Sequence, residues 1–112
     1  MNTHFHTPAV RIDTDGRYRK IDLGTDTREA LQAHVDSHDL DWVNLTDRLT
    51  AWCGAIAGDA VNRVGSRVIQ AFDPDQHDLT GPIVIAGDAG LNDAELAKIH
   101  RLIVAARKAG KR

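Results

Sequence analysis

The chain has 112 residues, a formal net charge of −2, and 42% hydrophobic against 27% charged residues, which is typical of one soluble globular domain. Its only cysteine is Cys53, which excludes an intrachain disulfide framework and a cysteine-based zinc site. The sequence shows no secretory leader and no apolar run of about 20 residues, so we expect a cytoplasmic protein that does not enter a membrane.

The first third of the chain predicts a hairpin and a helix. Residues 1–8 predict a flexible N-terminal arm, residues 9–110 a single domain, and residues 111–112 a basic tail. Within the domain, strands are expected on both sides of an Asp-Gly turn, from Ala9 to Asp13 and from Tyr18 to Leu23. A capping-box pattern then predicts a helix over residues 27–35.

The next segment predicts a second hairpin. Residues 42–46 and 49–53 alternate in the way that strands do, and residues 47–48 are expected to form a two-residue turn. Such a turn would place Trp42 and Trp52 on opposite faces. Because neither face is purely polar, we expect the hairpin to lie inside the sheet and to be covered on both sides.

An amphipathic helix is predicted from Asp59, as its N-terminal cap, to Phe72. Its apolar side chains share one side of the helix. The opposite side groups arginines with amide and hydroxyl side chains, and we take four of them as candidate binding residues: Asn62, Arg63, Ser66 and Arg67. The alternative is a solvated helix face that makes local ion pairs.

The last third predicts a strand and a long helix. Residues 82–86 form a short apolar run that predicts a buried strand. Asn92 and Glu95 form a second capping-box pattern, and an apolar stripe follows as far as Ala106, with Gly110 as the expected terminator. The order β-β-α-β-β-α-β-α predicts an α+β fold, with a mixed or antiparallel sheet packed with about three helices.

Several short strings of this chain, within residues 9–87, are similar to strings that occur in the same order in a known family. They are Ile21-Asp22, Glu29-Ala30-Leu31-Gln32 with Val35, Asp47 at the hairpin turn, Asn62-Arg63, and Asp78-Leu79-Thr80-Gly81 leading into Ile83-Val84-Ile85-Ala86-Gly87. Together they resemble a family of small proteins with a domain of unknown function, found in phages, plasmids and integrated elements of Gram-positive bacteria. The resemblance implies an accessory protein of a mobile element and no catalytic activity. An Asn-Glu pair usual in that family is replaced here by Gly54-Ala55.

Metal binding and catalysis have little support in the sequence. His34 and His38 stand four residues apart, a spacing that on a helix lets two imidazoles reach one metal, but no motif supplies a third ligand. Cys53 lies in a strand that is expected to be buried, where thiols are usually inert. We therefore expect no metal, no cofactor and no enzymatic activity.

The leading hypothesis is a non-enzymatic accessory protein of a phage or plasmid that binds a host protein or another host macromolecule, in anti-defence or replication control. Self-association, most simply as a homodimer, is also expected because a small sheet leaves edge strands. In a second hypothesis, Arg63 and Arg67 hold a nucleotide or another anion. In a third, these arginines and the basic residues after Glu95 bind nucleic acid, which the slightly acidic net charge disfavours.

Overall fold

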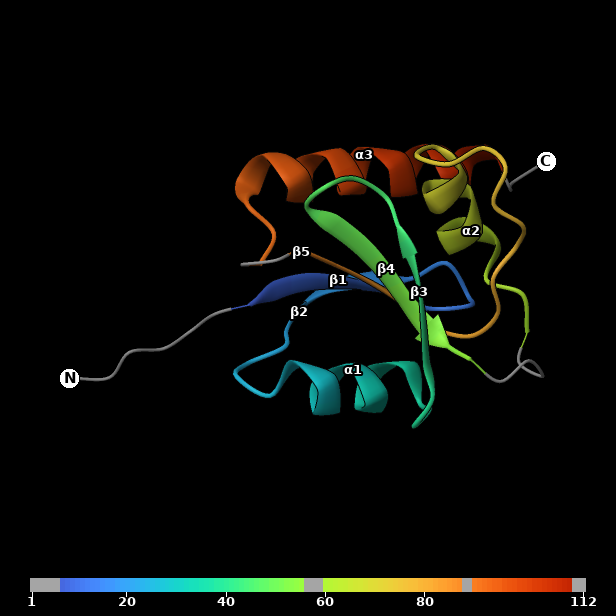
Figure 1. The fold of residues 1–112 in the computed structure, drawn as a ribbon. Coiled ribbons are helices and arrows are strands. Elements are labelled where there is room, and N and C mark those ends of the chain that lie inside the picture. The colour runs from blue at the N-terminus through green and yellow to red at the C-terminus, as the bar shows by residue number, and fades with distance from the viewer. Residues whose placement is uncertain (1–6, 56–59, 88–89, 110–112) are drawn as a thin grey trace.

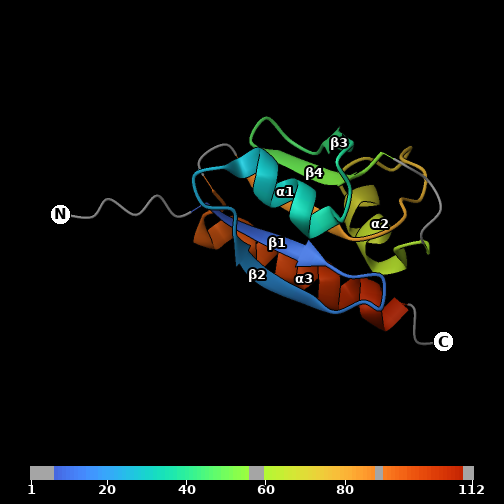
Figure 2. The same cartoon turned by 90° about the horizontal axis from the view of Figure 1, so that it is seen from below.

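The computed structural model describes residues 7–55, 60–87 and 90–109. In these residues a five-stranded antiparallel sheet lies between one helix on one face and two helices on the other (Figures 1 and 2). The elements are β1 (Pro8–Ile12), β2 (Tyr18–Asp22), α1 (Thr27–Val35), β3 (Leu40–Asn44), β4 (Leu49–Gly54), α2 (Arg63–Gln70), β5 (Ile83–Gly87) and α3 (Asp93–Ala109). The predicted element order and the α+β class are confirmed.

The strands lie in the order β2-β1-β5-β4-β3, and each pairs antiparallel with its neighbours. β5 is the central strand, and its residues Ile83 to Ala86 are all buried. A strand covered on both faces needs apolar side chains on both, which explains why this segment is a continuous apolar run. β2 and β3, by contrast, form the two edges of the sheet.

Each face of the sheet has its own apolar core. α1 lies over β4 and β5 and packs Leu31 and Val35 against Val84. On the other face, α2 and α3 pack together and cover the sheet, with Ile69 and Ile103 fully buried (Figure 1). No helix in the described residues is both long enough and apolar enough to cross a membrane.

The predicted starts of α1 and α3 are confirmed. At each start, a local side chain accepts a hydrogen bond from a backbone N–H group that has no partner within the helix. The carboxylate of Asp26 accepts from the N–H of Glu29 at 3.1 Å. At the start of α3, the side chain of Asn92 accepts from the N–H of Glu95 at 2.8 Å, and Glu95 accepts in return from the N–H of Asn92 at 3.0 Å. Gly110, the expected terminator of α3, lies outside the described residues.

The predicted register of the second hairpin is wrong by one residue. Trp42 lies directly opposite Trp52, with their ring centroids 5.7 Å apart, so the two side chains share a face. The turn is longer than predicted because Thr46 belongs to it, and its hydroxyl accepts from the N–H groups of Arg48 and Leu49. One added residue moves every side chain of a strand to the other face.

The expected position of that hairpin inside the sheet is also only half right. β4 is an inner strand, whereas β3 is an edge strand, and Trp42 is 55% exposed. The single helix on this face does not extend over β3.

The predicted N-terminal arm is shorter than residues 1–8, because Thr7 and Pro8 belong to the fold. Their carbonyl groups accept from the N–H groups of Leu23 and Leu91.

Candidate functional site

The predicted helix that carries the candidate binding residues starts later than expected. α2 begins at Arg63, and Asn62 is its N-terminal cap, because the Asn62 side chain accepts from the N–H of Gly65 at 2.9 Å. Val61 lies before the helix and forms an isolated bridge with Thr80. Asp59, the predicted cap, lies outside the described residues.

The amphipathic pattern predicts that Asn62 lies on the exposed face of the helix. This prediction is wrong, because Asn62 is completely buried. Its amide nitrogen donates to the carbonyls of Ile12 and Gly81, at 2.9 Å each. Its backbone N–H donates to the carbonyl of Leu79 at 2.8 Å. The residue therefore joins the end of β1, the start of α2 and the loop before β5.

Ser66 is also buried, with 1% of its surface exposed, so its predicted place on the contact surface is wrong. Its hydroxyl accepts from the N–H of Leu79 at 2.9 Å and lies 3.4 Å from the carbonyl oxygen of the same residue. Asn62 and Ser66 thus hold the loop before β5 against α2. Both are structural residues, and neither can touch a partner.

Gly65 explains how closely α2 approaches the sheet. A Cβ atom at this position would lie 2.6 Å from the Cδ1 atom of Ile83 and 2.8 Å from the side-chain oxygen of Asn62. Real Cβ atoms are almost never found so near another heavy atom. The absence of a side chain at Gly65 therefore lets α2 pack directly against Ile83 of β5.

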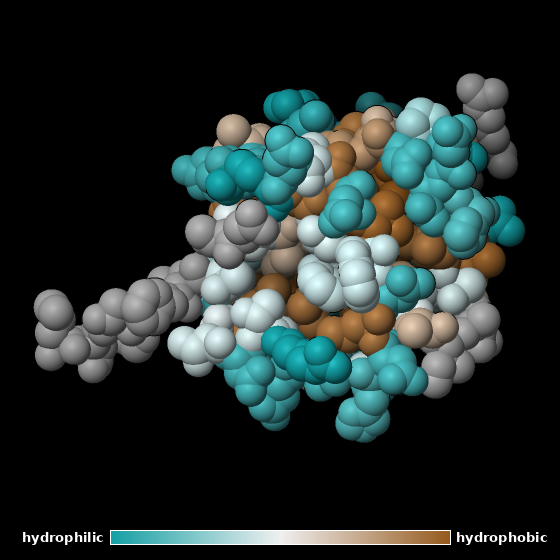
Figure 3. Space-filling view, viewed as in Figure 1, coloured by the Kyte–Doolittle hydropathy of each residue, from teal (hydrophilic) through white to brown (hydrophobic). Residues whose placement is uncertain are grey.

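Arg63 and Arg67 occupy that outer surface, and both are exposed. They line an open depression of about 350 Å³ together with Val61, Gln70 and Asp78. Figure 3 shows hydrophilic side chains gathered over α2 and the loop that follows it. Gln70 donates to the carboxylate of Asp78 at 2.9 Å, which fixes one wall of the depression.

The guanidinium groups of Arg63 and Arg67 differ from those of two other arginines, which form ion pairs with carboxylates. Arg11 forms an ion pair with Asp13 at 2.8 Å. Arg48 donates twice to Glu95, at 3.1 and 3.2 Å, and these bonds lower the pKa of the Glu95 carboxyl. Within the described residues, the guanidinium groups of Arg63 and Arg67 make no hydrogen bond or ion pair, so both are available to an anionic group.

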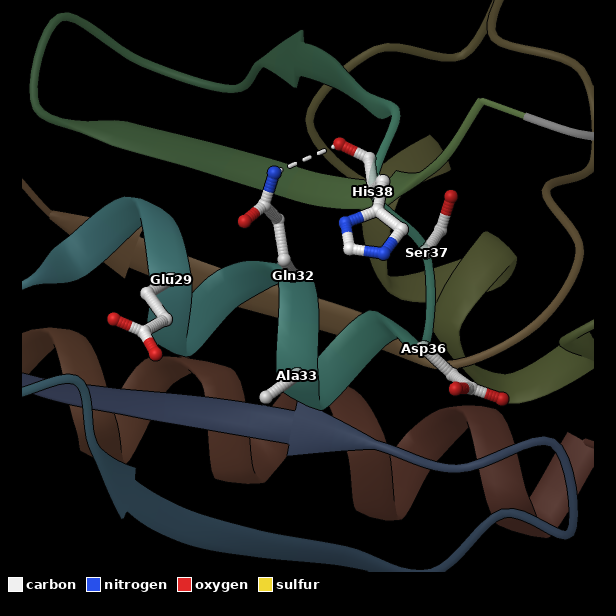
Figure 4. A pocket seen from close by; sticks show the side chains of 6 residues that line it. All are labelled: Glu29, Gln32, Ala33, Asp36, Ser37 and His38. Atoms are coloured by element: carbon white, nitrogen blue, oxygen red, sulfur yellow. Dashed lines mark hydrogen bonds between the residues drawn. The ribbon is translucent and has the colours of Figure 1, made fainter.

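The histidine pair does not form the arrangement that metal binding would need. α1 ends at Val35, and Asp36 adopts a left-handed conformation, so His38 lies beyond the helix. Figure 4 shows His38 at the rim of a pocket beside α1, where its carbonyl accepts from Gln32 at 2.9 Å. Among the described residues, no group of three or more His, Cys, Asp or Glu side chains could hold a metal ion.

His34 instead lies beside positive charge. Its Nδ1 atom is 3.4 Å from the guanidinium of Arg11. Burial lowers the pKa of His34, and the charges of Arg11 and Arg19 lower it further. The positive charges of Arg11 and Arg19 beside His34 would repel a cation, which counts against a metal at this position.

Cys53 has the environment that the sequence predicted. It is buried in β4, and burial together with the nearby Asp41 carboxylate raises the pKa of its thiol to about 11. The thiolate is the reactive form of cysteine, and it is scarce at neutral pH under these conditions. The residue therefore serves as a small apolar part of the core.

No family model, no curated protein and no solved structure matches this chain. The resemblance to the small proteins of mobile elements therefore depends on its short motifs alone. The sequence predicts that Arg63, Arg67 and Gln70 share one face of the helix, and the structure places these three at the same depression. Asp78 was missed, since nothing in the sequence shows that the loop before β5 folds back along the helix.

Proposed function

We propose that the protein is a non-enzymatic accessory protein of a mobile element that acts by binding a host protein. The observation that carries the proposal is the pair of exposed guanidinium groups, Arg63 and Arg67, which have no partner within the described residues. They stand one helical turn apart on a helix that Asn62 and Ser66 attach to the core. Guanidinium groups suit carboxylates, and because the helix backbone is attached to the core, only the two side chains must be ordered on binding.

The composition of the depression favours a protein over a nucleic acid. The Asp78 carboxylate lies in the same depression as the two arginines. A phosphate backbone presents only negative charge and so offers nothing to Asp78, whereas a protein surface can offer a carboxylate to the arginines and a donor to Asp78. Complementary patterns of both signs are usual at protein interfaces.

The first test is affinity purification of the tagged protein from a Gram-positive host, followed by calorimetry with the purified partner. Charge reversal in the Arg63→Glu and Arg67→Glu variants should weaken binding by tenfold or more, roughly the effect of losing a charge-assisted hydrogen bond. Arg28→Glu on α1 is the matched control, since it reverses another exposed charge on the opposite face of the sheet from α2, and it should bind normally.

An equal loss in all three variants would show that net charge, rather than this surface, controls binding. Unchanged binding in the two α2 variants would exclude the proposed surface.

A second candidate function is the sequestration of a small anion. The hollow of about 350 Å³ between the arginines and Gln70 favours it, because it is large enough for a nucleotide-sized group. Calorimetry with nucleotides separates the two functions. Saturable binding that is lost in Arg63→Ala and Arg67→Ala variants would support sequestration, whereas absence of heat with every nucleotide would exclude it.

A further inference from the structure

Two arginines stand directly opposite each other on the face of the sheet that carries α1. Arg11 of β1 pairs in register with Arg19 of β2, and on its other side Arg11 lies opposite Val84 of β5. Residues that lie directly opposite in a sheet share a face, and Val84 shares a core with Leu31 and Val35 of α1. Figure 2 views the sheet from this side. Both arginine side chains therefore project on the α1 face.

This pair of arginines is unfavourable by itself, because like charges directly opposite each other destabilise a strand pair. Asp13 offsets part of the charge of Arg11, since its carboxylate accepts from the Nε atom of Arg11 at 2.8 Å. Arg19 is exposed, and within the described residues its side chain makes no hydrogen bond or ion pair. The pair therefore keeps a positive charge that no carboxylate of the described residues binds.

His34 of α1 adds an imidazole to this pair. Its Nδ1 atom lies 3.4 Å from a terminal nitrogen of Arg11. A guanidinium can only donate, so Nδ1 accepts and the imidazole is neutral in this contact. Burial and the charges of Arg11 and Arg19 lower the pKa of His34. The nearby Asp13 carboxylate does not offset these charges, so positive charge dominates at the imidazole.

A hollow of about 380 Å³ opens beside this cluster, and the residues that line it include Arg11, Thr14, His34 and Asp36. Arg19 stands next to it, because it is the cross-strand neighbour of Arg11. The volume is large enough for an inorganic oxyanion or a small phosphorylated molecule. The Asp36 carboxylate opposes a second negative charge in the hollow, and this opposition gives the site a diagnostic variant.

We propose that Arg11, Arg19 and His34 form a binding site for a tetrahedral oxyanion, either inorganic phosphate or the phosphoryl group of a small molecule. An anion between the two guanidinium groups replaces their mutual repulsion with two attractive contacts, and guanidinium groups suit phosphoryl oxygens. The anion also favours the charged imidazole, which donates from both nitrogens. Protonation of His34 and binding of the anion therefore strengthen each other.

The oxyanion site is separate from the surface formed by Arg63 and Arg67. α1 and α2 cover opposite faces of the sheet, so the sheet itself lies between the two (Figure 1). Arg63→Ala and Arg67→Ala should therefore leave oxyanion binding at His34 unchanged. Failure of this site and failure of the α2 surface are distinguishable for the same reason.

Calorimetry with inorganic phosphate at constant ionic strength tests the site. Arg19→Gln should weaken binding by roughly tenfold or more, because it removes a charge-assisted contact. Asp36→Asn should strengthen binding, because it removes a negative charge from the hollow. Asparagine also tolerates the left-handed conformation that Asp36 adopts. Arg28→Gln, at another exposed position of α1, is the control and should bind like the wild type.

An NMR titration of the His34 ring provides a readout other than affinity. Sulfate is the probe here, since its charge is constant near neutral pH. The pKa of His34 should be higher in sulfate than in chloride of the same ionic strength, and Arg19→Gln should reduce this difference. The same titration with a nucleoside monophosphate identifies the source of the oxyanion: tighter binding than inorganic phosphate indicates a phosphorylated molecule, and equal binding indicates the free ion.

Three results would overturn the proposal. The first is the absence of saturable binding of phosphate and of the nucleoside monophosphate. The second is an affinity that Arg19→Gln does not lower or that Asp36→Asn does not raise. The third is a His34 pKa that is the same in sulfate and in chloride.

Discussion

At the residue scale, Asn62 has the greatest structural consequence. Its side chain uses both amide hydrogens and its oxygen, and all three partners are backbone groups of different segments, Ile12, Gly65 and Gly81. A buried amide with every donor and acceptor used is more favourable than its polarity suggests, because no desolvated group remains unpaired.

Asn62→Ala should lower the free energy of unfolding by about 2–4 kcal/mol, since the helix loses its cap and two buried carbonyls lose a donor. Urea denaturation followed by circular dichroism measures the change. The matched control is Asp26→Ala at the exposed cap of α1, where the loss should be about 1 kcal/mol. Equal losses at the two caps would show that the buried carbonyls of Ile12 and Gly81 contribute nothing.

His34 gives the stability a dependence on pH. Its pKa in the folded chain is lowered from 6.5 by burial and by the charges of Arg11 and Arg19, so the unfolded chain binds the proton more readily. Its contribution to stability is therefore complete above the unfolded pKa and is lost as pH falls from about 6.5 through the folded pKa.

His34→Gln should accordingly be less sensitive than the wild-type chain to a fall in pH through this window, when both are unfolded with urea. His38→Gln provides the comparison, because His38 is exposed and lies beyond the end of α1. If the His34 and His38 variants follow the same pH profile as the wild type, the positive surroundings of His34 do not affect stability.

At the scale of the elements, the sequence predicted well what depends on neighbouring residues. The starts of α1 and α3 follow from capping patterns that span only three residues, and the central strand β5 follows from an apolar run. The errors arose where distant segments meet. A polar residue such as Ser66 looks solvent-exposed on a helical wheel unless one knows that Leu79 returns to bind it. The hairpin register is the exception, because it was missed although the hydroxyl of Thr46 binds N–H groups only two and three residues further on.

The contact between α2 and β5 provides a prediction at this scale. Gly65→Ala should destabilise the fold by about 1–3 kcal/mol, although alanine favours helix more than glycine does, because the new methyl group collides with Ile83. Combining it with Ile83→Val, which removes the Cδ1 atom involved, should give a loss smaller than the sum of the two single losses. Additive losses in thermal unfolding would refute a direct collision.

At the scale of the whole molecule, the charges are distributed unevenly over the two faces of the sheet. The layer that contains α2 and α3 exposes six cations, Arg63, Arg67, Lys98, Arg101, Arg107 and Lys108, against three exposed carboxylates, Asp75, Asp78 and Asp93. The α1 side exposes carboxylates that include Asp26, Glu29 and Asp36. A net charge of −2 therefore conceals a polarised molecule, which an acidic partner would approach with the α2 side first. This arrangement could not be predicted from net charge, because it depends on which face each helix covers.

The three bonds of the Asn62 side chain have a thermodynamic consequence for any partner. They tie the base of the arginine surface to β1 and to the loop before β5, segments that stand 50 and 19 residues away in the chain. These bonds would have to break before the start of α2 could move away from the core. Binding energy gained at Arg63 and Arg67 therefore stabilises the whole domain, and a bound partner protects the central strand β5 against unfolding as well.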